Sequence, residues 1–93
     1  MKKKVLFVYG FEKRTPSQVT QMNRKLFGYI DQSFHGKYIY RRKGLLSDFN
    51  IERITKGVFL TDDLHHKKIN DTLHNLGAKK IRRYFLTIDK IIG

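Results

Sequence analysis

Strand and helix signals alternate along this chain, and their order limits the folds that it can adopt. Residues 5–9 are a run of β-branched, aliphatic and aromatic side chains that ends at Gly10, which is typical of a central strand. Residues 15–18 (Thr-Pro-Ser-Gln) are typical of a helix start, because the threonine and glutamine can form a capping box and proline suits the first helical position. We expect this helix to end at Gly28.

The second half of the chain repeats this alternation. Residues 36–43 are predicted to form a strand, and residues 51–60 contain another, most clearly at 57–60. Thr61 is expected to cap a second helix that ends at Gly77. Residues 79–88 are predicted to form the last strand.

The resulting order, β-α-β-β-α-β, is that of the ferredoxin-like split βαβ fold. We therefore predict an α+β domain with a four-stranded antiparallel sheet, two helices on one face and the other face open. The 93 residues are expected to form a single domain, 1–93, with its core in 4–88 and a tail at 89–93. The chain has no cysteine, which excludes disulfides, thiolate zinc sites and a cysteine nucleophile.

Positive charge is in large excess and is interleaved with tyrosine. Twenty Lys and Arg stand against eight Asp and Glu, a formal net charge of +12, and the densest segments are 37–43 and 79–85. Such a charge repels itself in a compact chain and is typical of proteins that bind a polyanion. Tyrosines among the cations offer surfaces on which unpaired bases can stack. Because the cations lie on predicted strands and not on an amphipathic helix, no membrane partner is expected.

The predicted site follows from the alternation of side chains along a strand. If Leu6 and Val8 point at the helices, Phe7 and Tyr9 point to the open face, where Tyr38 and Tyr40 can join them as stacking residues. Arg14, in the loop before the first helix, can hold a phosphate near the helix N-terminus. The cations predicted to neutralise further phosphates are Lys37, Arg41, Arg42, Lys43, Arg82 and Arg83.

Two short segments resemble the RNA recognition motif family. Residues 6–11 (Leu-Phe-Val-Tyr-Gly-Phe) resemble its first-strand motif, and Lys56-Gly57 matches the start of its third-strand motif. The resemblance implies the same βαββαβ fold and a base-stacking role for Phe7. With the charge and the tyrosines, it favours a non-catalytic protein that binds RNA rather than DNA and associates with ribonucleoprotein particles or the ribosome. No cofactor is expected.

Two other functions remain open. The sheet edge or open face can serve as a dimerisation or protein-interaction surface. Asp62 or Asp63 can serve a metal-dependent nuclease, although the adjacent His65 and His66 point about 100° apart on a helix and cannot easily share one ion. The basic N-terminus is followed by an apolar run too short for a signal peptide, so a cytoplasmic location is expected.

Overall fold

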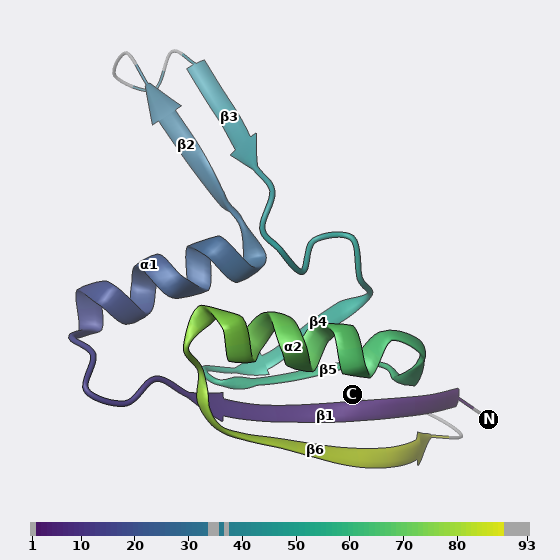
Figure 1. Ribbon diagram of the computed structural model, residues 1–93. Helices are drawn as coiled ribbons and strands as arrows, with labels where there is room; N and C mark the ends of the chain where they lie inside the picture. The colour runs from purple at the N-terminus through teal and green to yellow at the C-terminus, as the bar shows by residue number, and fades with distance from the viewer. Residues whose placement is uncertain (1, 34–35, 37, 89–93) are drawn as a thin grey trace. The chain divides into compact units, whose positions relative to one another are not determined.

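The computed structural model describes residues 2–33, 36 and 38–88 (Figure 1). The elements in chain order are β1 (Lys2–Gly10), α1 (Pro16–Phe27), β2 (Tyr29–Ser33), β3 (Tyr38–Arg42), β4 (Ile51–Thr55), β5 (Val58–Asp62), a 3₁₀ turn η1 (Asp63–His65), α2 (His66–Leu76) and β6 (Lys79–Ile88). The chain divides into two compact units. We call Met1–Lys13 with Phe49–Gly93 the sheet unit, and Arg14–Asp48 the hairpin unit.

The sheet unit contains a four-stranded sheet in the order β4-β5-β1-β6. Each neighbouring pair is antiparallel. The predicted α+β class, with a four-stranded antiparallel sheet and two helices, is confirmed. The predicted last strand and the end of α2 at Gly77, which adopts a left-handed conformation, are confirmed as well.

Helix α2 lies against one face of this sheet (Figure 1). His66 lies at the start of α2. The centre of its ring is 5.0 Å from the centre of the Phe85 ring, and its Nδ1 atom is 3.0 Å from a guanidinium nitrogen of Arg83. Phe85 and Arg83 pair across the strands with Val5 and Phe7. Directly opposed residues of an antiparallel pair share a face, so α2 covers the face that carries Val5 and Phe7.

This orientation reverses the predicted faces of β1. Phe7 is fully buried and Tyr9 is 7% exposed, whereas Leu6 and Val8 are half-buried on the opposite face. The Phe7 ring stacks on Phe59 with centroids 5.0 Å apart. The prediction that Phe7 and Tyr9 offer stacking surfaces to bases is therefore wrong, because their rings form the core. Burial also raises the pKa of the Tyr9 hydroxyl.

Thr61 was expected to cap the second helix, and this is wrong. It lies inside β5, fully enclosed, where its hydroxyl donates to the backbone oxygen of Asn50 at 2.7 Å. Residues 51–60, predicted to contain one strand, include β4 and the first part of β5, which pair side by side as an antiparallel hairpin. The turn contains Gly57 at φ 76°.

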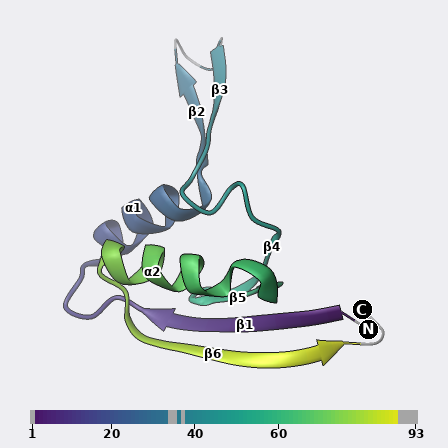
Figure 2. The same cartoon turned by 45° about the vertical axis from the view of Figure 1, so that its right-hand side comes forward.

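The hairpin unit begins with α1, whose capping box is confirmed. The Gln18 amide donates to the Thr15 hydroxyl at 3.2 Å, and the Thr15 amide donates to the Gln18 side chain at 3.0 Å. Gly28 ends the helix, as predicted. Strands β2 and β3 then form a separate two-stranded ribbon, which Figure 2 shows side by side. The prediction that residues 36–43 belong to the main sheet is wrong, because Tyr29–Ser33 is itself a strand and takes β3 as its partner.

Candidate nucleic-acid interface

The ribbon of β2 and β3 presents tyrosines and an arginine on one side. Tyr38, Tyr40 and Arg42 alternate along β3 and so share a face. We call this side the aromatic face. Tyr38 is 45% exposed and Tyr40 is 48% exposed, although each is a large apolar ring. The aromatic face therefore offers flat surfaces to a ligand next to a fixed positive charge.

Arg42 is held in place by two weak contacts on this face. Its guanidinium lies 5.4 Å from the centre of the Tyr40 ring and 3.4 Å from a carboxylate oxygen of Asp31. Both partners of the ion pair are about half exposed, and such a pair contributes little to stability. A phosphate can therefore compete with Asp31 for Arg42 at small cost.

A cavity of about 640 Å³ is lined by residues from the end of α1, the start of β2, and the end of β3 with the loop that follows it. Its lining residues all belong to the hairpin unit: Gln21, Arg24, Lys25, Tyr29, Arg42, Lys43, Gly44 and Leu45. Four of these are cations, and none is acidic. The Arg24 guanidinium lies 5.2 Å from the centre of the Tyr29 ring. Within the described residues, Arg24, Lys25 and Lys43 form no ion pair with a carboxylate.

Backbone hydrogen bonds fix the walls of this cavity. The carbonyls at the end of α1 accept from the loop that follows β3: Leu45 donates to Lys25, and Leu46 to Leu26, each at 2.8 Å. These bonds satisfy acceptors that a helix C-terminus otherwise leaves free. The fully buried side chains of Leu26 and Leu46 complete the junction. The cationic side chains of Arg24, Lys25 and Lys43 consequently project from a hydrogen-bonded frame.

The structure brings together part of the predicted site. Tyr38, Tyr40 and Arg42 share the aromatic face, and Lys43 lies at its base. Arg41 points to the other side of the ribbon, where it pairs with Ile30. Lys37 lies outside the described residues.

Arg14 is exposed before α1. At this helix start, the Gln18 amide already donates to the Thr15 hydroxyl, and Pro16 has no amide hydrogen to donate. The predicted phosphate site at this helix start thus loses two of its donors.

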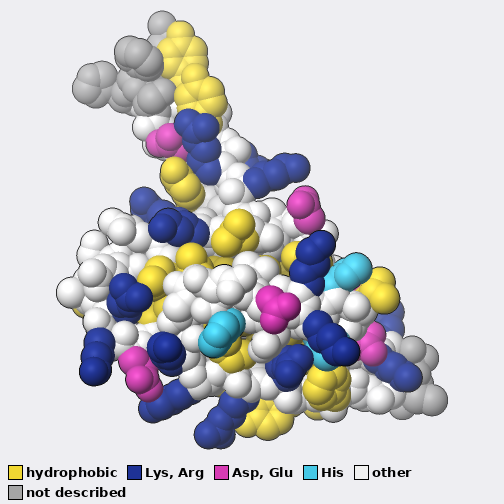
Figure 3. Space-filling view, viewed as in Figure 1, with side chains coloured by type: hydrophobic (Ala, Val, Ile, Leu, Met, Phe, Trp, Pro, Cys, Tyr) yellow, Lys and Arg dark blue, Asp and Glu magenta, His cyan; other side chains and the backbone are white. Residues whose placement is uncertain are grey.

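Arg82 and Arg83 do not form one site. Arg82 pairs with Val8 and Arg83 with Phe7, so the two side chains leave opposite faces of the sheet. Arg83 instead lines a smaller cavity of about 410 Å³ with Asn70, His74, Ala78, Lys79, Lys80 and Ile81. Cationic side chains are spread over the face of the molecule seen in Figure 3.

Sequence reasoning missed Gln21, Arg24, Lys25, Tyr29 and Leu45. A usable signal was present in Tyr29 and Ile30, a β-favouring pair directly after the helix-ending Gly28. Treating residues 29–33 as the strand partner of 38–42 would have placed Tyr29 opposite Arg42.

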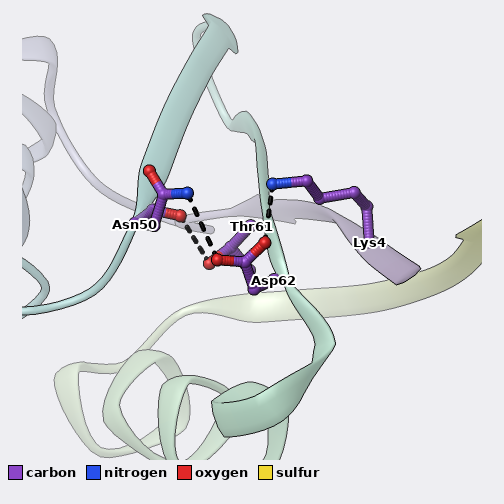
Figure 4. Close-up of polar contacts among 4 residues, drawn as sticks. All are labelled: Lys4, Asn50, Thr61 and Asp62. Atoms are coloured by element: carbon purple, nitrogen blue, oxygen red, sulfur yellow. Dashed lines mark hydrogen bonds and ion pairs between the residues drawn. The ribbon is translucent and has the colours of Figure 1, made fainter. Parts of the chain in front are cut away.

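Asp62, a candidate nuclease residue, is engaged in a structural network (Figure 4). It binds the Lys4 ammonium at 2.6 Å and accepts from the Asn50 amide at 3.2 Å. Both hydrogen bonds lower the pKa of the Asp62 carboxyl, and the one from Lys4 has the larger effect. In the described part of the chain, no group of three or more His, Asp or Glu side chains is placed to hold a metal ion.

Replacing Asp62 by asparagine is expected to destabilise the protein at pH 7 by roughly 1–2 kcal/mol, because it leaves the mostly buried Lys4 ammonium without its partner. The pKa of Asp62 is lower in the folded state, so the pair stabilises fully above about pH 4 and the contribution is lost as the pH falls below it. Urea unfolding at pH 7 and at pH 2 measures both effects. Asp71→Asn, an exposed change on α2, is the control. A difference from wild type that persists unchanged at pH 2 would contradict this role.

No helix within the described residues is long and apolar enough to cross a membrane. A scan of the chain against models of protein families finds no match, and searches among curated proteins and solved structures find none either.

Proposed function

We propose that this protein binds nucleic acid without catalysis and prefers single-stranded RNA to DNA. One observation carries the proposal: the aromatic face places two half-exposed tyrosines and Arg42 side by side on a ribbon. The hairpin unit has seven Lys and Arg against two acidic residues, Asp31 and Asp48. A cytoplasmic location and association with a ribonucleoprotein particle, both expected from the sequence, remain part of the proposal.

The spacing on β3 suits an unpaired strand. Tyr38 and Tyr40 are two residues apart, which is about 6.8 Å along a strand, or twice the roughly 3.4 Å rise per nucleotide of a stacked chain. Bases in single strands can leave their stack and lie on aromatic rings, whereas bases in a duplex cannot. A two-stranded ribbon can also enter the major groove of B-DNA, so duplex DNA is the necessary comparison.

Binding to labelled single-stranded RNA, duplex RNA and duplex DNA across a salt series tests the proposal. If about 5–7 phosphates are contacted, the affinity is expected to fall with a log–log slope of about −4 to −6. The single strand is expected to bind most tightly. Absence of binding to any of the three at low salt would overturn the proposal.

Replacing Tyr38 and Tyr40 by alanine is expected to weaken binding to single-stranded RNA by roughly 1–3 kcal/mol for each stacked base lost. Binding to duplex DNA is expected to change little, because the cations remain. The measurement is fluorescence anisotropy at one fixed salt concentration. Tyr84→Ala is the matched control, since Tyr84 is 46% exposed but lies on β6 of the sheet unit. Equal losses on the duplex and the single strand would reject the stacking role.

The ferredoxin-like connectivity predicted from the sequence is also part of the proposal. We infer that the main sheet has ferredoxin-like connectivity with the β2–β3 ribbon inserted after α1. The support is the strand order across the main sheet, β4-β5-β1-β6. When only the strands of this sheet are numbered along the chain, so that β1, β4, β5 and β6 become strands 1 to 4, this order reads 2-3-1-4. Nuclear Overhauser contacts between the backbones of neighbouring strands of the sheet unit test this strand order. The resemblance to the RNA recognition motif family is proposed at the same level, without a stacking role for Phe7.

Self-association is the second candidate function. Strand β6 forms an edge of the sheet, and it exposes Tyr84, Phe85 and Leu86 in succession at 46%, 61% and 40%. An edge with exposed apolar side chains can pair with a second copy. Lys79, Lys80 and the arginines on the same strand oppose such pairing by repulsion. Sedimentation at several protein concentrations distinguishes a dimer from the monomer.

A further inference from the structure

We propose that the cavity at the base of the ribbon binds one nucleotide unit, a base with its 5′-phosphate. The inference rests on the proposed function and gives it a defined subsite. The same chemistry is present in a free nucleoside monophosphate and in a nucleotide of a single strand. The cavity volume of about 640 Å³ lies within the range of about 300–1,000 Å³ that is usual for small-molecule sites.

The cavity offers a surface for a base. Tyr29 is 41% exposed, and its ring is oriented by the Arg24 guanidinium 5.2 Å from its centre. Leu45 is 57% exposed on the same lining. An aromatic ring and an exposed apolar side chain in the lining suit the flat face of a base. The Gln21 amide, with a donor and an acceptor, can meet the polar edge of that base.

The same cavity offers charge for a phosphate. Lys25, Arg42 and Lys43 line it, and none of the lining residues that the structure describes is acidic. The loop amides of Leu45 and Leu46 already donate to helix carbonyls, and the Gly44 amide donates to Ser47. A phosphate must therefore be bound by the cationic side chains. Among the described residues, the weak pair of Arg42 with Asp31 is the only ion pair that these side chains form with a carboxylate.

The cavity continues the aromatic face. Tyr29 stands opposite Arg42 in the ribbon, and Asp31 stands opposite Tyr40. Tyr29 consequently shares a face with Tyr38 and Tyr40. A single strand that follows this face towards α1 reaches the cavity at Arg42, which contributes to both surfaces.

Amide and side-chain NMR spectra of the full chain, titrated separately with uridine 5′-monophosphate, uridine and inorganic phosphate, test the inference. The monophosphate is expected to shift signals of residues 21–29 and 42–46 and to bind more tightly than uridine or phosphate. Shifts spread evenly over both units, or equal binding of monophosphate and phosphate, would overturn the inference.

Variants separate a base subsite from general charge. Tyr29→Leu is expected to weaken monophosphate binding by roughly 5- to 150-fold, the loss of one stacked base, while Tyr29→Phe retains binding. Lys25→Gln with Lys43→Gln is expected to weaken binding and to reduce the salt slope for a single strand by about 1.4. Lys67→Gln with Lys68→Gln, two exposed cations on α2, is the matched control. If Tyr29→Leu and this control behave alike, the cavity does not hold the base.

The two proposals fail in different ways. If the protein binds RNA, and Tyr38 and Tyr40 matter but Tyr29 does not, the function stands and the subsite is wrong. If the monophosphate binds in the cavity but no RNA or DNA is bound, the free nucleotide is the ligand and the proposed function is wrong. Weaker RNA binding by Tyr29→Leu, together with monophosphate shifts at the cavity, supports a subsite within the strand-binding surface.

Discussion

Phe7→Ala is expected to lower the free energy of unfolding by about 3–5 kcal/mol, because a fully buried ring is removed from the centre of the sheet unit. The Phe7 ring is stacked on the Phe59 ring, with centroids 5.0 Å apart and 13° between the planes, so the substitution also removes the stacking partner of Phe59. A loss of this size is a large share of the stability of a small domain, which is about 5–15 kcal/mol. Urea unfolding followed by circular dichroism measures it.

Three further variants decide whether the face of β1 is assigned correctly. Phe85→Ala removes the same ring at a position that is 61% exposed and is expected to cost below about 1 kcal/mol. Leu6→Ala, on the half-buried opposite face, is expected to cost less than Phe7→Ala. Phe7→Leu retains most of the buried volume and keeps the comparison measurable if the alanine variant does not fold. A larger loss for Leu6→Ala than for Phe7→Ala would restore the orientation predicted from the sequence.

That prediction failed because residues 5–9 are apolar throughout, so alternation of polar and apolar side chains cannot choose a face. The residues before the run do not choose a face either, because Lys2 and Lys4 have the parity of Leu6 and Val8, whereas Lys3 has the parity of Phe7 and Tyr9. Lys4 is itself mostly buried, but its ammonium is bound by Asp62.

The local signals for the starts and ends of helices predicted the structure correctly, whereas the pairing of strands was predicted only in part. The capping box at Thr15 and the helix ends at Gly28 and Gly77 depend on neighbouring residues, and the structure contains all three. The partner of residues 38–42 depended on recognising 29–33 as a strand. Tyr29 and Ile30 favour a strand, but the pair is too short to fix the bounds of that strand or its pairing register.

The candidate site was predicted in part for the same reason. Tyr38, Tyr40 and Arg42 share a face in any strand, whether it lies in a sheet or in a ribbon. Arg24 and Tyr29 join them through the junction between the end of α1 and the loop after β3, and that junction is a tertiary contact. Charge density alone also does not show that Arg82 and Arg83 leave opposite faces of the sheet, which follows because neighbouring residues of a strand point to opposite faces.

Gly44→Ala is expected to disrupt this junction and destabilise the hairpin unit by about 1–3 kcal/mol. A Cβ atom at Gly44 would overlap with the backbone oxygen of Leu26 and the backbone nitrogen of Gly28. Both neighbours are backbone atoms, so the loop must move away from the helix end. The movement breaks the bonds from the Leu45 and Leu46 amides and opens the wall that carries the cavity's cations.

Hydrogen exchange resolved by residue is the measurement for Gly44→Ala. The amides of Leu45 and Leu46 are expected to lose protection, while that of Phe59 in the sheet unit keeps it, because the change is confined to one compact unit. Gly10→Ala is the control, since a Cβ atom there meets nothing within 4 Å. The cost at Gly44 is steric, so Gly44→Ser is expected to lose protection as well. Unchanged protection of Leu45 and Leu46 in both variants would show that the loop does not approach α1 this closely, and the cavity would then lose the frame that positions Lys43.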